Sequence, residues 1–476
     1  MNQLTKHKLL LMLAAFSVFA ACKVPQITGK TETANIPVQF GQQTDTTNMV
    51  ATKWRNYFSD PGLAVLIDTA LKNNQELNIM LQEMEISRNE IRVRKGEYMP
   101  FVNLQAGIGY DKAGEYTRNG AVEEGLEIKP GKAFPKPLGD YMIGAVASWE
   151  LDVWNKLHNA TKAAALRYLS TIEGKNFMVT NLIAEIAESY YELMALDNQL
   201  MIVEQNIELQ TNALKIVKQQ KEAAKVTQLA VNRFEAQLLN TQNLRYEIAQ
   251  RITENENRIR FLTGSYTTVI PRNPSLFTDM QLEEMKTGVP SQLLVNRPDI
   301  RQAELKLEAA KIDVQVARAN FYPSFRIQAG LGFQAFNPLY LIKPESILYN
   351  LAGDMMAPLV NKNAITATYY NANAQQTQAV YKYEQAILNA YTEVLNQLAK
   401  ADNFSKSHTM KQKEVDILLQ SVQISNSLFN SARADYMEVL LTQREALESK
   451  MELIEIKMKQ LSAKVNIYKA LGGGWN

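Results

Sequence analysis

One strand-like segment occurs twice in this chain, and this repeat constrains the fold more than any other feature. Residues 100–110 read PFVNLQAGIGY, and residues 323–333 read PSFRIQAGLGF. Both copies alternate apolar residues with polar residues or glycines. Because successive side chains of a strand point to opposite faces, each copy predicts a strand with one apolar and one polar face. Transmembrane barrels of outer membranes have this pattern, with lipid outside and water inside.

Two further alternating segments complete the set, of which the last, near 346–356, is the weakest of the four. Each half of the chain therefore predicts one hairpin. The Gly/Pro/Lys-rich residues 111–140 predict a surface loop inside the first hairpin, and a shorter loop follows in the second. The four predicted strands are about 101–110 and 141–151 in the first half, and about 324–334 and 346–356 in the second.

Most of the remaining chain predicts unusually long helices. Apolar residues recur at alternating steps of four and three, which is the spacing of a coiled-coil seam. At 1.5 Å per residue, a helix over residues 156–222 would be roughly 100 Å long. The seam of this helix consists of Leu182, Ile186, Ser189, Leu193, Leu196, Leu200, Val203, Ile207, Gln210, Leu214 and Val217.

Breaks in the helical pattern predict the organisation of the chain. Helical character weakens near 223–227 and 431–436, which predicts tight turns between antiparallel helices at corresponding places of the two halves. The predicted parts are a signal peptide (1–21), an anchored N-terminal segment (22–60), repeat 1 (61–264, long helices about 156–222 and 227–262), an irregular connection (265–290), repeat 2 (291–471, long helices about 362–430 and 435–470) and a tail (472–476).

The N-terminus predicts export to the cell envelope. Lys6 and Lys8 precede an apolar run over residues 9–21 that is too short to span a bilayer and resembles a signal sequence. The run ends at Cys22, the only cysteine of the chain, so no disulfide framework exists. The segment around Cys22 resembles a bacterial lipobox, which predicts a lipidated first mature residue. The alternative is an incidental cysteine near a cleavage site.

Charge and composition exclude several classes of function. Residues 1–21 carry two lysines and no acid, so their removal leaves 49 basic residues against the 49 acidic ones. A neutral chain gives no electrostatic case for nucleic-acid binding. Only three histidines occur, and no phosphate-binding loop, cysteine metal cluster or nucleophile motif stands out. We therefore expect no enzyme activity, cofactor or metal site.

The four strands also predict an oligomer. No apolar run after residue 21 is long enough for a membrane helix, so a membrane-spanning form must use strands. The smallest closed membrane barrels need about eight strands, and an open edge in lipid leaves unpaired backbone groups at several kcal/mol each. Copies of the chain must therefore pool their strands, and three copies would supply twelve.

A long motif resembles a known family. Residues 289–304 read VPSQLLVNRPDIRQAE, and together with Ala309-Ala310 and residues 317–319 they closely resemble TolC-like outer-membrane factors, especially their lipoprotein branch. Residues 54–77 resemble the opening of the first repeat, and residues 149–154 resemble the strand-to-helix signature. After Trp154 the family usually has glycine and arginine, where this chain has Asn155 and Lys156.

The resemblance implies a mixed architecture of membrane β-barrel and all-α coiled-coil tunnel, with a small mixed equatorial domain. It implies a homotrimer in outer-membrane lipid, with a twelve-stranded barrel and a periplasmic tunnel. It also implies a passive exit duct for drugs or other small toxic compounds. The expected partners are a periplasmic adaptor (membrane fusion) protein and an inner-membrane RND transporter.

The resemblance further implies functional residues at the two predicted helix turns. The adaptor-contact candidates are Ala224, Lys225, Thr227, Ala432, Arg433 and Asp435, and the periplasmic gate candidates are Arg433, Asp435 and Glu438. The family usually has glycine where this chain has Ala224 and Ala432. The alternative interpretation of these charged residues is an ordinary solvated helix surface.

Two other functions compete with the efflux duct. One is an exit duct for type I polypeptide secretion. The other is a lipid-anchored coiled-coil scaffold of the envelope that never forms a pore. Conductance in planar bilayers would separate a duct from a scaffold.

Overall fold

The computed structural model describes residues 24–33, 36–40, 53–280, 288–431 and 433–475. Cys22 and Ala432 lie outside these residues. The chain divides into two compact units, described here separately. The strand unit comprises the described residues of Met1–Thr31, Glu85–Leu169 and Leu305–Val380, and the helix unit comprises those of Glu32–Met84, Ser170–Glu304 and Tyr381–Asn476.

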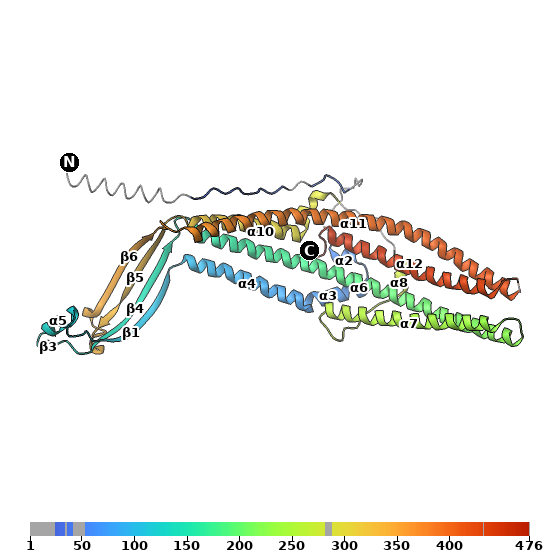
Figure 1. The fold of residues 1–476 in the computed structure, drawn as a ribbon, viewed down its shortest axis with the longest axis horizontal. Helices are drawn as coiled ribbons and strands as arrows, with labels where there is room; N and C mark the ends of the chain where they lie inside the picture. The colour runs from blue at the N-terminus through green and yellow to red at the C-terminus, as the bar shows by residue number, and fades with distance from the viewer. Residues whose placement is uncertain (1–23, 34–35, 41–52, 281–287, 432, 476) are drawn as a thin grey trace. The chain divides into compact units, whose positions relative to one another are not determined.

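The strand unit contains a four-stranded antiparallel sheet in the order β1-β4-β5-β6 (Figure 1). The prediction of one hairpin from each half is confirmed, and β4 and β5 join the two hairpins. The strands span Phe101–Asp111 (β1), Leu138–Leu151 (β4), Ser324–Ala335 (β5) and Ile347–Met356 (β6).

The register places apolar residues of all four strands on one face of the sheet. One row across the sheet consists of Leu104, Ala145, Leu331 and Tyr349. The Leu104 and Tyr349 side chains are 80% and 82% exposed in the single chain. The opposite face carries most of the glycines and polar residues of the strands, together with Met142, Val146 and Leu348. On this face Gln334 Nε2 donates to Asp140 at 2.9 Å. The alternation predicted from the sequence therefore extends coherently over both halves.

The segment between β1 and β4 contains regular structure that its composition did not predict. A short helix, α5 (Arg118–Gly125), precedes a small hairpin of β2 (Glu127–Lys129) and β3 (Lys132–Ala133). The Thr117 hydroxyl caps α5 by accepting from the Gly120 amide at 3.2 Å. Gly131 has a φ of 77° in the two-residue turn between the strands, a conformation that glycine adopts easily.

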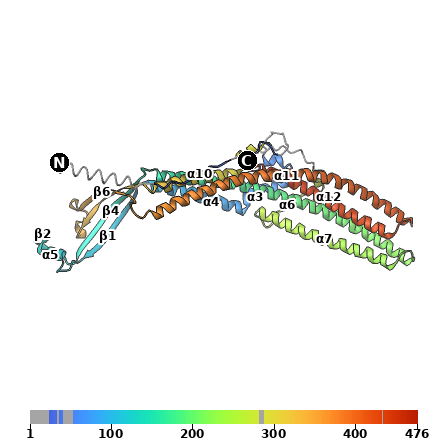
Figure 2. The ribbon, with the colours of Figure 1, turned by 45° about the horizontal axis from the view of Figure 1, so that its top comes forward.

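Four long helices form two antiparallel hairpins, as the seam spacing and the breaks near 223–227 and 431–436 predicted (Figure 2). The first hairpin consists of α6 (Lys156–Glu222) and α7 (Gln228–Leu262), and the second of α11 (Asn363–Asn430) and α12 (Tyr436–Ala470). In the described part of the chain, no helix has both the length and the apolar character to cross a membrane.

Shorter elements surround these hairpins. In each half, one helix leads to the first strand: α4 (Gln75–Tyr98) precedes β1, and α10 (Pro298–Ala319) precedes β5. The others are α2 (Trp54–Tyr57), α3 (Pro61–Asn73), α8 (Ser275–Asp279), α9 (Leu293–Asn296), η2 (Pro290–Gln292), η3 (Pro338–Tyr340) and η4 (Pro344–Ser346).

The core of the helix unit forms where α3 packs among α6, α7 and α12. Leu63, Leu66 and Ile67 of α3 have no exposed surface. Asp60 starts this helix, because its carboxylate accepts from the amides of the first turn and from the Tyr190 hydroxyl at 3.1 Å. Burial and the nearby Asp60 carboxylate raise the pKa of Tyr190 well above its ordinary range. This aspartate therefore joins a helix cap to the core.

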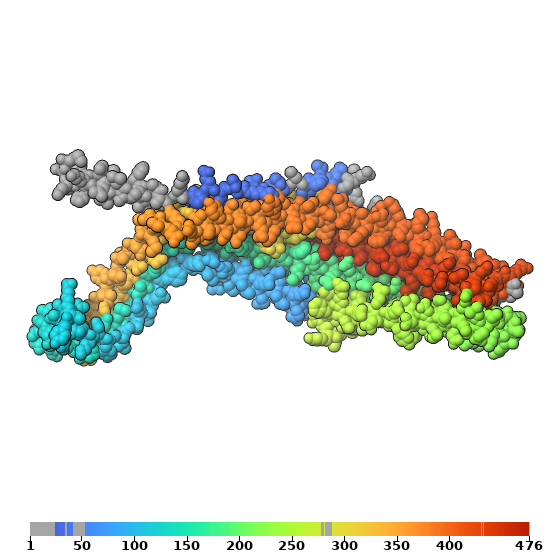
Figure 3. Space-filling model, in the orientation of Figure 1, coloured from blue at the N-terminus to red at the C-terminus, as the bar shows by residue number. Residues whose placement is uncertain are grey.

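The N-terminal segment is held against α11 (Figure 3). In the strand unit, Val24 and Ile27 pack against the cluster of Phe321 and Tyr369. In the helix unit, the Phe40 ring stacks on Tyr391 at 5.8 Å between centroids. The chain that follows Cys22 is thus anchored by side-chain contacts within each unit.

The two strand-to-helix junctions have the same unusual backbone. Asn155 before α6 has a φ of 55°, and Asn361 before α11 has a φ of 53°. Asparagine tolerates this left-handed conformation better than most residues other than glycine. Asn155 therefore suits the left-handed backbone that precedes α6. Asp152 completes the first junction by accepting from the amides of Leu157 and His158.

Candidate channel end at the helix hairpins

The α6/α7 turn contains a left-handed alanine. Ala224 has a φ of 56°, and the amide of Lys225 donates to the Gln220 carbonyl at 2.9 Å. This bond spans five residues, as in the Schellman motif that ends many helices. Thr227 then stands in extended conformation before α7. Ala224, Lys225 and Thr227 are all exposed.

The α11/α12 turn repeats this hydrogen bond at the corresponding position. The Arg433 amide donates to the Leu428 carbonyl at 2.8 Å, again across five residues. Asp435 precedes α12 in extended conformation, and its side chain makes no capping bond. The exposed side chains of Lys225 and Arg433 therefore follow equivalent bends of the two hairpins.

The three gate candidates lie together near the start of α12. Arg433, Asp435 and Glu438 are exposed, and the Glu438 amide donates to the Asp435 carbonyl at 3.1 Å. Among the described residues of one chain, no ion pair joins Arg433 to either carboxylate.

Apolar packing stabilises the turn end of the helix unit. Leu214 and Val217 of α6 pack with Phe234 and Leu238 of α7, and Leu440 of α12 joins the same cluster. Burying a large apolar side chain contributes about 2 kcal/mol, so this cluster holds the two hairpins together near their tips.

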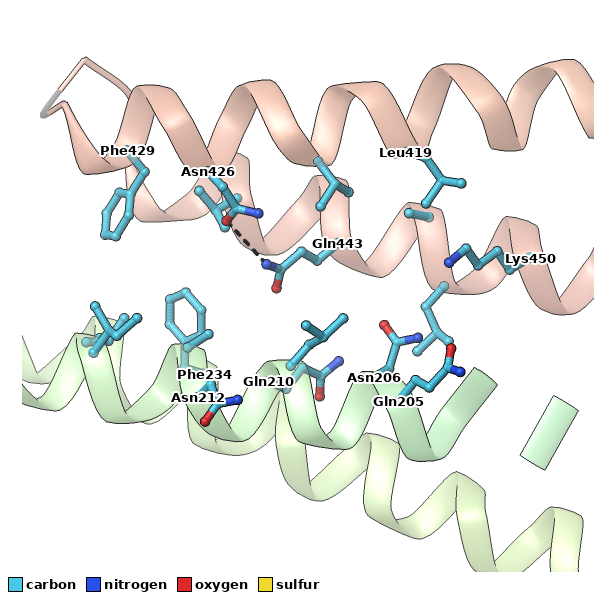
Figure 4. A pocket seen from close by; sticks show the side chains of 18 residues that line it. Gln205, Asn206, Gln210, Asn212, Phe234, Leu419, Asn426, Phe429, Gln443 and Lys450 are labelled. Atoms are coloured by element: carbon cyan, nitrogen blue, oxygen red, sulfur yellow. Dashed lines mark hydrogen bonds between the residues drawn. The ribbon is translucent and has the colours of Figure 1, made fainter. Parts of the chain in front are cut away.

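A cavity of about 360 Å³ lies between the two hairpins (Figure 4). Apolar side chains form much of its wall, including Phe234 and Leu419. Gln210 lies in the wall, is 4% exposed, and has no hydrogen-bond partner for either amide atom among the described residues. The Gln443 amide nitrogen contacts the Asn426 oxygen at 3.5 Å. The cavity is therefore amphipathic.

A buried arginine of the VNRPD segment ties three elements together. Arg297 is 5% exposed, donates to both oxygens of Asp299 at 3.0 and 2.7 Å, and pairs with Glu393 at 2.8 Å. It also donates to the Ala470 carbonyl at the end of α12, at 2.7 Å. Burial alone would lower the pKa of Arg297, but the Asp299 and Glu393 partners raise it. This motif is a structural clamp of the helix unit.

A second arginine fixes the connection between the halves. Arg272 pairs with Asp197 of α6 at 2.6 Å and with Glu256 of α7 at 2.8 Å. Burial opposes its charge, yet the two carboxylates raise the pKa of Arg272 above its usual value. Asn198 adds a bond from its amide nitrogen to the Pro274 carbonyl at 2.9 Å. Among the described residues, no group of three or more His, Cys, Asp or Glu side chains is placed to hold a metal ion.

The pattern of the outer membrane efflux protein family matches residues 66–265 and 289–473, which is most of the chain. The chain belongs to the outer membrane efflux protein family. It is therefore an outer-membrane channel of the efflux type and not an enzyme. The two matched ranges overlap the repeats predicted over 61–264 and 291–471. The resemblance to TolC-like outer-membrane factors is confirmed.

Relatives and solved structures agree with this membership. The chain is 27% identical to the probable outer membrane lipoprotein SilC of Salmonella typhimurium, over 89% of this chain and 88% of the relative. It is 28% identical to the solvent efflux pump outer membrane protein SrpC of Pseudomonas putida, with the same coverage. The fold matches a CusC crystal structure with a TM-score of 0.82 at 24% identity, covering 94% of this chain and 99% of that chain.

A further match extends the fold comparison. The open-state crystal structure of the Neisseria gonorrhoeae MtrE outer membrane channel has a TM-score of 0.83 at 20% identity, covering 95% of this chain and 98% of that chain.

Sequence reasoning did not find the cavity or the Arg272 pairs. One residue could have indicated the cavity from the sequence, because Gln210 occupies a position of the α6 seam where an apolar residue is expected. The Arg272 pairs had none, since nothing local indicates which helices the connection reaches.

Proposed function

We propose that three copies of this chain form the passive outer-membrane exit duct of a tripartite RND-type efflux pump. In this assembly the twelve pooled strands close a barrel and the helix hairpins form a periplasmic tunnel. The observation that carries the proposal is the sheet itself. Its β1 and β6 edges have no partner strand among the described residues, and one of its faces is apolar and exposed. Open edges of this kind are costly in lipid.

The internal repeat predicts how the edges meet. Ala106 and Ala329 are equivalent in the repeated segment; the first pairs with Ile143 and the second with Leu351. Leu351 therefore occupies in β6 the place that Ile143 occupies in β4.

The junction inside the chain then serves as a template for the junction between copies. Ile143 pairs with Phe333, whose equivalent in β1 is Tyr110. If the junction between copies repeats the junction inside one chain, Leu351 lies opposite Tyr110 of the next copy.

Cysteine crosslinking tests this register. Cross-strand neighbours have Cα atoms about 5 Å apart, which suits a disulfide. Tyr110→Cys combined with Leu351→Cys should yield covalent trimers on mild oxidation in the membrane. Tyr110→Cys combined with Leu348→Cys is the matched control, because the second cysteine is on the opposite face. Equal crosslinking of both pairs, or of neither, would contradict the register.

Conductance tests the duct separately. The full-length protein in planar bilayers should give steady single-channel currents. A protein that crosslinks as expected but carries no current would be an envelope scaffold and not a duct.

The proposed cargo is a class of small toxic compounds, such as drugs or solvents. SrpC is named for solvent efflux and CusC for cation efflux, and both relatives match along most of the chain. A deletion strain should become sensitive to some members of a panel of drugs, solvents, bile salts and metal ions. Unchanged sensitivity to all of them together with lost secretion of a polypeptide would favour the type I alternative.

Lipidation of Cys22 is part of the proposal. SilC is named a lipoprotein, and the segment following Cys22 packs on the strand unit through Val24 and Ile27. Labelled palmitate should enter the wild-type protein and not the Cys22→Ala variant. Equal labelling of both proteins would show that Cys22 does not carry the lipid.

The two hairpin turns are the proposed adaptor contacts, formed by Ala224, Lys225, Thr227, Ala432, Arg433 and Asp435. The exposed side chains after equivalent bends support this role. Photocrosslinkers at positions 225 and 433 should capture the periplasmic adaptor, whereas one at exposed Tyr246, in the middle of α7, serves as control. Capture from position 246 alone would contradict the assignment.

Arg433, Asp435 and Glu438 are the proposed gate residues. Around a symmetric ring, guanidinium and carboxylate groups of neighbouring copies would pair in the closed state. The Arg433→Ala/Glu438→Ala variant should show raised conductance. Unchanged conductance would remove these residues from the gate.

A further inference from the structure

The cavity between the hairpins has a chemistry that the duct does not need. Its wall contains six carboxamide side chains and one cation, with no carboxylate among the described residues that form it. The charged residue is Lys450, for which no acidic partner is found within 4.0 Å in the described part of the chain. The carboxamides are Gln205, Asn206, Gln210, Asn212, Asn426 and Gln443.

Gln210 has no hydrogen-bond partner for either atom of its side-chain amide among the described residues. An amide that is nine-tenths buried without partners costs about 1–3 kcal/mol, so such groups are rare unless something else satisfies them. The neighbouring seam positions Leu214 and Val217 are apolar and packed. A plain coiled-coil seam would use an apolar residue at position 210 as well. Figure 4 shows Gln210 on α6 facing the hairpin that carries Gln443 and Lys450.

The apolar wall defines the rest of the ligand. Ile216, Phe234, Leu419 and Phe429 surround the same space as the polar groups. A volume of about 360 Å³ is in the range of small-molecule sites and exceeds what a few waters fill. An occupant would thus need an apolar body, one acceptor-rich head for the amides and a negative charge for Lys450.

We propose that this cavity is a binding site for a small anionic amphiphile, such as a medium-chain carboxylate. The head would lie between Gln210 and Lys450, and the alkyl body against the aromatic wall. A ligand held between α6/α7 and α11/α12 stabilises the hairpin spacing that it binds. Binding of the amphiphile would therefore change how the two hairpins pack at the channel end. This inference does not depend on cargo passing through the pore.

The experiment measures decanoate binding to the full-length protein in nanodiscs, with anilinonaphthalene sulfonate fluorescence as the displacement signal. Decanoate should bind saturably, whereas neutral decanol and decyltrimethylammonium should bind about tenfold more weakly, since they lack the charge that Lys450 and the amides recognise. Non-saturating partition, or equal affinity for all three probes, would overturn the proposal.

Variants locate the site. Gln210→Leu and Lys450→Gln should each weaken decanoate binding about tenfold. Exposed Gln420→Leu and exposed Lys413→Gln are matched controls on α11, outside the cavity, and should bind like the wild type. Gln210→Leu should also raise the thermal unfolding midpoint of the ligand-free protein, because it removes an unsatisfied amide. If both cavity variants bind decanoate as tightly as the controls, the proposal is wrong, whatever the conductance of the protein.

Discussion

Arg297 and Asp299, two residues apart, form a two-bonded pair of 3.0 and 2.7 Å at the start of α10. The same guanidinium reaches Glu393 of α11 and the last carbonyl of α12. A short sequence motif thus fixes three helices of the helix unit at one point. The planar fork of arginine suits this geometry, and the single ammonium of lysine does not.

Arg297→Lys should destabilise the protein by about 3 kcal/mol, because the partly buried Asp299 and Glu393 would lose most of their bonds to the buried guanidinium. The thermal unfolding midpoint of the purified protein measures the effect. Arg301→Lys is the matched control, since Arg301 is exposed and pairs only with Glu304 among the described residues. Equal midpoints for the two variants would contradict the clamp.

Ala224→Gly should stabilise the turn by about 1 kcal/mol, because the left-handed backbone strains any residue with a Cβ. Ala236→Gly lies at an exposed position inside α7 and should destabilise by a similar amount. Denaturant unfolding of both variants shows whether each change raises or lowers the free energy of unfolding. Destabilisation by both would show that the Ala224 turn is not strained.

Gly332→Ala should weaken the sheet by about 2 kcal/mol. A Cβ at this position would lie 2.6 Å from the Ile143 carbonyl oxygen and 2.7 Å from the Gly144 Cα. Gly107→Ala is the control, because its Cβ would meet nothing within 4 Å on the same face. The amount of folded protein in the outer membrane should fall only for Gly332→Ala. Equal amounts would show that β4 and β5 separate without cost.

Stability should decrease in mild acid through His408. Burial, and then the Lys457 charge, lower the pKa of His408 below its ordinary 6.5. The folded state therefore binds this proton less well than the unfolded state. The stability that neutral His408 contributes to the folded state is fully present above about pH 6.5. It is lost as the pH falls through the pKa of His408 in the folded protein. His408→Gln should make unfolding midpoints less pH-dependent between about pH 7.5 and pH 5. If the unfolding midpoint of His408→Gln depends on pH as strongly as that of the wild type, His408 does not cause the loss of stability in acid.

The sequence was sufficient for the elements that follow a regular period. The repeat around Ala106 and Ala329 predicted the strands, and the seam from Leu182 to Val217 predicted the long helices. Both signals are local, since each depends on which face of one element is apolar.

Other features depended on contacts between distant segments. The pairing of β4 with β5, the Arg297 bonds to Glu393 and Ala470, and the Asn198 bond to the connection cannot be read from any local period. The candidate site at the helix turns was predicted only in part. The turns were found from weakened helical pattern, but the left-handed Ala224 was visible only in the backbone, because alanine normally favours helix.

The equivalence of the two hairpins has an evolutionary consequence. The β1/β4 hairpin and the β5/β6 hairpin have equivalent strand edges. Consecutive hairpins in a ring would therefore pair in the same way whether or not a peptide connects them. A ring of six half-length chains would satisfy the same strand pairing as three full chains. Fusion of two such halves leaves that pairing unchanged and lets each half diverge alone. In this chain it is the second half that carries the arginine clamp, at Arg297.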